Sequence, residues 1–540
     1  MTTQRLLIML LAGMLVSGCA QFTPYRTATS AGSAPMGVEC EVPRKLADGS
    51  VAKAAFPPCE EAGSDDSGIS PALQHRHYTA SFKAKDGSED SPDSGEYFLS
   101  FVEFDDQGWF ADRAQMDALL ALLKDLKEKN RKTLIYVYAH GWKHNASACD
   151  NNVVCFSRLL ERLDLAEKKL FTDEHTKEEK RAVVGVYVGW RGLPFGSAFN
   201  NLSFWSRKDT AARVGRGGVF ELLTRLNDYR DSRQAGETMD SPGTQLIITG
   251  HSFGGLVVYS ALSHALMERA ARTTTDTNDT RYDEAKSFGD FVMLVNPAFE
   301  GSLYEPLFHI ATNRCYGKTQ QPVMMIVTSD ADSATRVAFP IGRGLSTIFQ
   351  HAKSPAQRES ILKTIGHDPR YVTHDLTDES DSGEEAKVVD DSKCGCPYLE
   401  PTATWDQQSL LALISASAAV ALGGNDYSGR VCKDSKPITL TSSVPGKYAA
   451  NYPYLVVKTD AKLIPNHNAI YNERFTTFTQ AFILWHVLQG LPLSADNDKK
   501  QCFADEENSA QPDSGGLLPL ELSCVDAKGS ACASATERAH

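Results

Sequence analysis

From residue 96 onward, short apolar runs alternate with segments in which apolar residues recur every three or four positions. The runs have the length of β-strands, and the recurring residues have the spacing of one helix face. Strands and helices that alternate in this way form a mostly parallel sheet covered by helices. The sequence therefore predicts an α/β fold. Seven strands are predicted, at residues 97–104, 134–139, 183–188, 246–249, 291–295, 323–327 and 454–458.

Two apolar stripes predict helices beside these strands. One stripe covers residues 116–126 and consists of leucines and a methionine, and a second stripe of similar spacing covers residues 156–163. An amphipathic helix with one apolar face typically packs that face against a sheet and does not use it to bind a ligand. We expect both helices to contribute to the hydrophobic core.

The chain has 540 residues, more than a usual single domain, so one large domain with extensions is expected. Residues 20–95 are rich in Ser, Gly, Pro and Asp and show little periodicity, which is typical of a flexible tether. Residues 96–495 form the predicted folded domain. Residues 496–540 are polar and weakly patterned and are expected to form a weakly ordered tail.

The N-terminal segment, residues 1–19, has the pattern of a secretion signal. Arg5 precedes an apolar run over residues 6–16, which is too short to span a membrane comfortably. The small residues before Cys19 resemble the lipobox of bacterial lipoproteins, in which the signal is cleaved and the cysteine is acylated. The resemblance implies a lipid anchor in the bacterial cell envelope, in the periplasm or at the cell surface, and Ala20 after the cysteine favours the outer membrane.

Composition excludes some partners and favours others. After the N-terminus, no apolar run approaches the roughly 20 residues that a spanning helix needs. The formal net charge is -13, and no basic stripe offsets it, so we expect no nucleic-acid partner. The expected contact with a membrane is therefore through the lipid anchor alone.

Twelve cysteines fit an oxidising compartment, where thiols pair in disulfide bonds. With Cys19 acylated, eleven remain, so at least one stays unpaired or bonds outside the chain. Cys149 and Cys155 flank a short polar loop and are the pair most readily proposed. No cysteine or histidine set has the spacing of a metal site, so no metal is expected.

The segment from Gly250 to Gly254 reads Gly-His-Ser-Phe-Gly and matches the pattern Gly-x-Ser-x-Gly. It follows the predicted strand at 245–249 directly and precedes an apolar segment at 256–262 that can continue as a helix. Strand, sharp turn and helix together form a nucleophile elbow, which lifts a serine side chain above the sheet edge. Such a turn strains the backbone and leaves no room for side chains at its two glycines. Ser252 is therefore the candidate nucleophile.

A second motif, Ala-His-Gly-Trp, follows the predicted strand at 134–138. Together with the elbow, it resembles the α/β-hydrolase superfamily, near its esterases and lipases, over roughly residues 96–495. The resemblance implies the α/β-hydrolase fold and an oxyanion loop at this motif. The implied oxyanion donors are the backbone N–H groups of Trp142 and Phe253. The His140 side chain is expected to shape the loop rather than to act in catalysis.

In that family, the nucleophile is followed by an acid after a later strand and then by a histidine after the last strand. Asp332 follows the predicted strand at 323–327 by a few residues and is the candidate acid, with Asp330 as the alternative. His467 is the candidate base because it lies in a loop between the last predicted strand and the closing helix. His367 and His374 are the alternative bases.

The distance from the acid to the base along the chain is long for the family and indicates an insertion at about 337–450. Within it, the acidic stretch at 376–393 is interpreted as a loop. Residues 192–218 and the insertion could supply a lid or a substrate wall. Arg207 and Lys208 in the first of these segments are interpreted as solvated helix residues in preference to substrate contacts.

These residues predict a serine hydrolase that cleaves carboxylic esters through an acyl-enzyme, without a cofactor. The expected substrate is a small-molecule or lipid ester. Thioesters, amides and acyl transfer to an acceptor other than water remain open because they share the mechanism. A surface binding or assembly protein that keeps the hydrolase fold without turnover is the alternative from another class.

Overall fold

A computed structural model describes most of the chain beyond residue 95. The expected lipidation residue Cys19 and the tail at 496–540 lie outside the described residues. The described residues are 25, 41–45, 51–55, 76–79, 96–147, 150–171, 180–192, 204–232, 243–273, 284–316, 320–379, 429–433, 436–443, 447–448 and 452–487.

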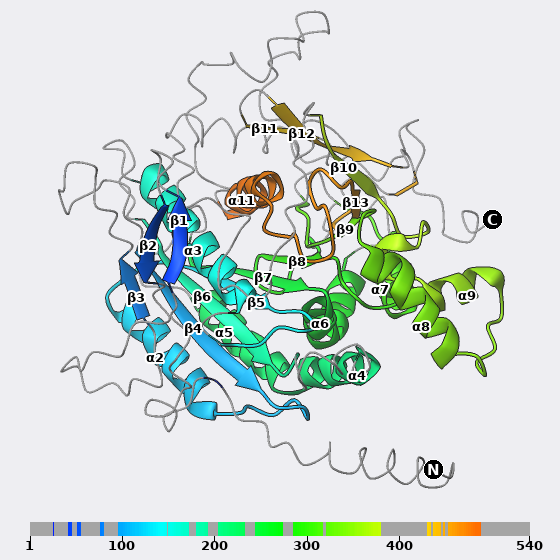
Figure 1. Cartoon of the computed structure of the whole chain (residues 1–540), viewed down its shortest axis with the longest axis horizontal. Helices are drawn as coiled ribbons and strands as arrows, with labels where there is room; N and C mark the ends of the chain where they lie inside the picture. Colours follow the sequence, from blue (N-terminus) through cyan, green and yellow to red (C-terminus); the bar gives the residue numbers. More distant parts are fainter. Residues whose placement is uncertain are drawn as a thin grey trace, which may run out of the picture.

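The described part of the chain forms an α/β fold around a mostly parallel sheet (Figure 1). The sheet has eleven strands in the order β11-β12-β10-β13-β9-β8-β7-β5-β6-β4-β3. The pairs from β10 through β4 are parallel, whereas β3, β12 and β11 pair antiparallel at the two edges. The strands are β3 (Arg76–Thr79), β4 (Glu96–Phe104), β5 (Thr133–Ala139), β6 (Ala182–Trp190), β7 (Gln245–His251), β8 (Phe291–Val295), β9 (Met324–Ser329), β10 (His374–Asp378), β11 (Gly429–Lys433), β12 (Lys436–Ser442) and β13 (Tyr454–Thr459).

All seven predicted strands coincide with strands of this sheet, namely β4 to β9 and β13. The central strands are buried along their whole length, as expected where helices cover both faces of a parallel sheet. Side chains alternate between the faces: Tyr136 and Tyr138 of β5 belong to one core, and Ile135 and Val137 belong to the other.

Helices cover both faces of the sheet (Figure 1). The two predicted stripes lie on α2 and α3, on opposite faces, so both predictions of core-forming helices are confirmed. At the start of α2, the Asp112 side chain accepts a hydrogen bond from the Ala114 N–H (3.0 Å) and caps the helix. One face carries α3 (Asn151–Phe171) and α11 (Glu473–Val487); the other carries α2 (Arg113–Glu128), α4 (Phe204–Val214), α5 (Phe220–Asp231), α6 (Phe253–Ala271) and α7 (Gly301–Thr312).

The chain connections change sides of the sheet at the carboxyl ends of β5 and β7. These strands are neighbours, but α3 after β5 packs on one face, whereas α6 after β7 packs on the other. Connections that leave adjacent parallel strands toward opposite faces open a crevice above the strand ends, where ligands of such folds bind. Both sequence motifs lie in the loops at this point.

The segment between the candidate acid and the candidate base adds structure that the sequence analysis did not predict. It contains η7 (Ala334–Ala338), α8 (Phe339–Ser346), α9 (Pro355–Leu362), η8 (Ile365–His367) and the three strands β10, β12 and β11. β10 pairs with β13 and thereby extends the main sheet. The interpretation of residues 376–393 as a loop is wrong for its first residues, because Leu376 to Asp378 belong to β10. Pairing with β13 and β12 satisfies the backbone of these residues despite their polar composition.

Three short strands lie within residues 20–95, for which the sequence indicated little periodicity. β1 (Glu41–Lys45) and β2 (Val51–Ala55) pair with each other, and β3 pairs antiparallel with β4 at the edge of the main sheet. Cys155 on α3 is disulfide-bonded, while its expected partner Cys149 lies outside the described residues. None of the described helices is both long and apolar enough to cross a membrane.

Candidate active site

Ser252 occupies the turn between β7 and α6. Its φ of 55° and ψ of -120° place the backbone in a region that residues with a side chain rarely adopt. The close packing around the turn explains the two glycines. A Cβ on Gly250 would lie 2.5 Å from the carbonyl oxygen of Gly254, and one on Gly254 would overlap the carbonyl oxygen of Ala139. The strand, the sharp turn and the helix that the motif predicts are all present around Ser252.

Backbone hydrogen bonds hold the strained turn in place. The Ser252 N–H donates to the Val295 carbonyl (3.1 Å), and the Ser252 carbonyl accepts from the N–H groups of Gly255 (3.0 Å) and Ala298 (3.1 Å). The ends of β7 and β8 and the start of α6 thus fix the serine from three sides. A strained residue persists only where its surroundings determine it in this way.

The structure brings Ser252, His467 and Asp332 together, although they are far apart in the sequence. His467 Nε2 lies 2.7 Å from Ser252 Oγ, and His467 Nδ1 lies 2.7 Å from Asp332 Oδ2. The two imidazole nitrogens therefore connect the hydroxyl to the carboxylate. With a proton on Nδ1 donated to the carboxylate, Nε2 can accept the hydroxyl proton.

Asp332 is fully buried and richly hydrogen-bonded. Its Oδ1 accepts from the N–H groups of Ala334 (2.9 Å) and Thr335 (3.1 Å), and its Oδ2 accepts from the Thr335 hydroxyl (2.5 Å) and from His467. Burial alone would raise the pKa of Asp332, but His467 and the Thr335 donors outweigh it and lower that pKa to about 2. The acid is therefore a carboxylate at neutral pH.

The alternative residues lie elsewhere. Asp330 is half exposed and forms an ion pair with Lys458 (3.1 Å), away from His467. His367 lies behind the acid, where its Nε2 is 3.1 Å from the Thr335 hydroxyl, and His374 opens β10 with its Nδ1 on the hydroxyl of Thr373. Burial lowers the pKa of both His367 and His374 to about 4.

Two residues that the sequence analysis did not select hold the backbone of His467. The carbonyl oxygen of His467 lies 2.8 Å from His251 Nε2 and 3.1 Å from Asn296 Nδ2, and both nitrogens donate to it. Asn296 follows β8 with a φ of 45°, and its Oδ1 accepts from the Ser329 N–H (2.9 Å). His251 is part of the elbow motif, but nothing in one sequence tells which of its neighbours its side chain contacts.

The loop after β5 packs directly against the serine. A Cβ on Gly141 would lie 2.8 Å from Ser252 Cβ, so only glycine allows this approach. Trp142 is the next residue in that loop, and Phe253 is the first residue of α6, where backbone N–H groups lack partners within the helix. One expected donor thus follows Ser252 directly in the chain, and the other follows the glycine that packs against Ser252.

His140 is a structural residue of this loop. Its Nε2 accepts from the Trp190 N–H (3.1 Å), its Nδ1 donates to the Gly141 carbonyl (2.9 Å), and its carbonyl accepts from the Trp190 indole (2.9 Å). The imidazole stacks on the Trp190 ring with an interplanar angle of 8°. Burial lowers the pKa of His140 to about 4, so the ring is neutral and its nitrogens are engaged with the backbone.

Aromatic rings from α4 and α8 border the loop and the elbow. Phe204 contacts the rings of Trp142 (5.1 Å between centroids) and Phe253 (4.8 Å), and Trp205 contacts Phe339 (5.6 Å). This part of residues 192–218 therefore forms an apolar wall beside Ser252.

The interpretation of Arg207 and Lys208 as solvated residues is wrong, since both are buried. Arg207 pairs with Asp106 (2.8 Å), and Lys208 pairs with Glu300 (2.9 Å). These ion pairs anchor α4 to the loops after β4 and before α7. The buried charges have partners within the protein, which gives them a structural role.

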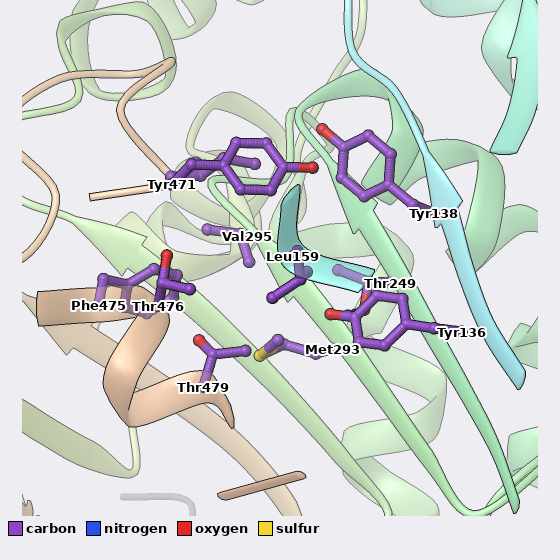
Figure 2. Close-up of a pocket in the computed structure, with 11 residues that line it drawn as sticks. Tyr136, Tyr138, Leu159, Thr249, Met293, Val295, Tyr471, Phe475, Thr476 and Thr479 are labelled. Carbon is purple, nitrogen blue, oxygen red and sulfur yellow. Dashed lines mark hydrogen bonds between the residues drawn. The ribbon is translucent and has the colours of Figure 1, made fainter. Parts of the chain in front are cut away.

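A small pocket lies between the sheet and α11 (Figure 2). The hydroxyls of Tyr136, Tyr138 and Thr249 face it, and the buried hydroxyls of Thr476 and Thr479 on α11 have no hydrogen-bond partner among the described residues. A volume of about 30 Å³ holds one or two water molecules but no substrate. This pocket is therefore too small to belong to a substrate site.

Among the described residues, no group of three or more His, Cys, Asp or Glu side chains could hold a metal ion. Comparison with known proteins gives no match, neither to a protein family nor to a curated protein. The arrangement of the three side chains itself therefore indicates what the site can do. A hydroxyl bonded to an imidazole, which is bonded in turn to a buried carboxylate, beside backbone N–H groups, can activate the hydroxyl and stabilise an oxyanion.

Proposed function

We propose that this chain is a serine hydrolase of the α/β-hydrolase fold that cleaves carboxylic esters through an acyl-enzyme. The observation that carries the proposal is the continuous hydrogen-bonded chain from Ser252 Oγ through His467 to Asp332, with both links at 2.7 Å. These distances are those of a nucleophile, a base and an orienting acid ready for proton transfer. The finer fold assignment is supported by the elbow after β7, the glycine loop after β5 and the chain order serine, aspartate, histidine.

Acylation begins when His467 Nε2 accepts the proton of Ser252 and the serine oxygen attacks the ester carbonyl carbon. The backbone N–H groups of Trp142 and Phe253 are the proposed donors to the oxyanion that forms. His467 then gives its proton to the leaving alcohol oxygen as the carbon–oxygen bond breaks. Asp332 stays ionised throughout and stabilises the imidazolium, in keeping with its low pKa.

Deacylation repeats these steps with water. His467 takes a proton from a water molecule, whose oxygen attacks the acyl carbon, and the proton then returns to Ser252 Oγ as the ester to the enzyme breaks. The products are a carboxylic acid and regenerated enzyme. An acceptor alcohol, amine or thiol in place of water would convert the same residues to acyl transfer.

A fluorophosphonate probe tests the proposal because it reacts only with an activated serine. We expect labelling of the wild-type chain, no labelling of Ser252→Ala or His467→Ala, and unchanged labelling of Ser346→Ala, which removes an exposed serine on α8. Hydrolysis of nitrophenyl esters of graded chain length then identifies the preferred acyl group. A folded wild-type chain that neither reacts with the probe nor hydrolyses any ester would favour the surface binding or assembly protein instead.

We further propose that Cys19 is acylated and anchors the chain in the bacterial cell envelope, with the outer membrane favoured. The small residues before this cysteine and the apolar run before them support the proposal. Incorporation of a labelled fatty acid into the expressed chain, abolished by Cys19→Ser, is the expected result. Labelling that persists in Cys19→Ser would contradict it.

A further inference from the structure

One surface of the protein exposes apolar side chains in an unusual concentration. Nine large apolar side chains are exposed among the described residues, and five of them lie between residues 337 and 349. We call these five residues the α8 face. They are Val337 (52% exposed), Ile341 (63%), Leu345 (71%), Ile348 (65%) and Phe349 (93%).

The α8 face follows from the helical repeat. Val337, Ile341 and Leu345 are spaced by four residues and so lie on one side of the helical segment formed by η7 and α8. Ile348 and Phe349 follow directly after the helix. Figure 1 shows α8 and α9 at the periphery of the molecule, beyond α7 and away from the sheet. A group of exposed apolar residues on one side of a peripheral helix marks an interaction surface.

The opposite side of the same segment is fixed, so the α8 face cannot turn inward. Phe339 is fully buried, and a Cβ on Gly342 would overlap the ring of Trp205, so this side packs tightly on α4. At the N-terminal end, the Thr335 hydroxyl donates to the Asp332 carboxylate. These contacts determine which side of the helix is exposed.

The charged side chains of the segment that carries the α8 face are all basic. Residues 333–358 contain three arginines and one lysine and no Asp or Glu, in a chain with a net charge of -13. Arg343 pairs with Glu300 (3.2 Å). Arg336 and Arg358 donate to the backbone carbonyls of Asp330 and Thr347, bonds that leave their charges in place.

We propose that the α8 face docks on a lipid bilayer that contains anionic headgroups. An amphipathic helix with aliphatic and aromatic residues on one side and basic residues around them lies in the membrane interface, with the apolar side among the acyl chains. The positive charges of Arg336, Lys353 and Arg358 complement the negative surface potential of such a bilayer. Docking by this face requires neither the lipid anchor nor the proposed hydrolase activity.

Charge disfavours a second copy of this chain as the occupant. A two-fold symmetric contact through the α8 face would bring the same basic residues of both copies together. The buried side of the same helix, opposite to the α8 face, is linked to the candidate active site, because Phe339 contacts Phe204 (6.3 Å between ring centroids), which in turn contacts Trp142.

Co-sedimentation with vesicles tests the proposal. The full chain carrying Cys19→Ser, which cannot be acylated at that position, is mixed with vesicles of phosphatidylcholine alone or with added phosphatidylglycerol. We expect binding to the mixed vesicles, weakened by salt. The triple substitution Ile341→Ser, Leu345→Ser and Phe349→Ser should lower this binding by on the order of tenfold or more, because it removes the residues that insert.

Two further variants complete the test. Lys353→Glu should reduce the preference for phosphatidylglycerol, whereas Phe220→Ser, which removes an exposed aromatic residue on α5, should bind as the parent chain does. A parent chain that binds neither kind of vesicle, or a triple variant that binds equally well, would overturn the proposal. The oligomeric state of both proteins in solution gives a further check. The proposal would also be overturned if the parent chain were a dimer, the triple variant a monomer, and vesicle binding the same for both. The assay measures no turnover, so its result is separate from that of the hydrolase tests.

Discussion

Two loops at the same edge of the sheet each carry a histidine, and the two imidazoles have different surroundings. His140, after β5, is fully buried, and both its ring nitrogens bond to backbone groups. The side chain of His467, after β13, is 21% exposed, and its ring nitrogens reach Ser252 and Asp332.

This difference assigns the two histidines to different tasks. A buried imidazole whose nitrogens already serve the backbone stays neutral and has no nitrogen available for a substrate proton, so His140 holds the loop. The imidazole of His467 is hydrogen-bonded to a carboxylate on one nitrogen and to a hydroxyl on the other, so His467 suits acid–base chemistry. Both histidines lie near the ends of strands, so this position does not distinguish their roles. Their hydrogen-bond partners do.

The largest expected effect is the loss of His467. We expect His467→Ala to lower kcat/KM for a nitrophenyl ester by about 10⁴-fold or more, because no other group takes the serine proton. The free energy of unfolding, measured with urea, should change by only about 1 kcal/mol, since the ring is partly exposed. Activity within tenfold of the wild type would remove His467 from the proposed mechanism.

The next effect concerns the orientation of that ring. Asp332→Asn keeps an oxygen that can accept from the N–H groups of Ala334 and Thr335 but loses the carboxylate that orients and stabilises imidazolium. We expect kcat to fall by about 10³- to 10⁴-fold. Steady-state kinetics should show the loss in kcat, and Asp330→Asn is the matched control with near wild-type rates.

The buried histidines predict how stability depends on pH. Burial lowers the pKa of His140, His367 and His374 to about 4 and that of His251 well below its usual range. Between pH 6.5 and about 4, these four side chains therefore bind more protons in the unfolded chain than in the folded chain, so they lower the free energy of unfolding as the pH falls. Each histidine contributes up to about 1.4 kcal/mol per pH unit.

Urea unfolding at several pH values between 7 and about 4 measures this dependence. His374→Asn should give a shallower slope than the wild type because it removes one of the four groups. A slope of His374→Asn as steep as that of the wild type would contradict the neutral, buried state of His374. Asp332, with its pKa of about 2, does not counteract this decrease between pH 7 and 4. It lowers the free energy of unfolding further only at more acidic pH.

His140→Ala should mainly lower the stability of the protein and leave Ser252 reactive, whereas His467→Ala should mainly lower activity. The substitution leaves the Trp190 N–H without its acceptor and opens a cavity against the indole ring. We expect a loss of about 3 kcal/mol in the free energy of unfolding. Fluorophosphonate labelling of the folded fraction should persist, and its complete loss would indicate that His140 acts in the chemistry after all.

The smallest expected effect on activity comes from loss of a hydrogen bond to the His467 carbonyl. Asn296→Asp keeps the acceptor for the Ser329 N–H but replaces the Nδ2 donor to the His467 carbonyl with an oxygen. We expect kcat to fall by about tenfold with little change in KM, because the base is displaced and the substrate contacts are not. A rise in KM at constant kcat would instead place Asn296 among the binding residues.

Much of the candidate site could be predicted because its signals are local. The elbow motif lies between a strand and a helix that both show in the residue pattern, and the glycines of this turn are required by contacts within a few residues. Asp332 and His467 each follow a recognisable strand, and parallel strands bring their carboxyl ends to one edge of the sheet. These residues could therefore be selected from their positions relative to the strands.

The sequence by itself determined the seven central strands, the helices α2 and α3 and the strained turn, because apolar periodicity and glycine requirements depend on near neighbours. Only the tertiary structure decided which aspartate meets His467, that His251 and Asn296 hold its backbone, that β10 joins the sheet, and that Arg207 and Lys208 are buried in ion pairs. Each of these depends on atoms brought together from distant parts of the chain, and one linear pattern does not specify which distant groups will meet.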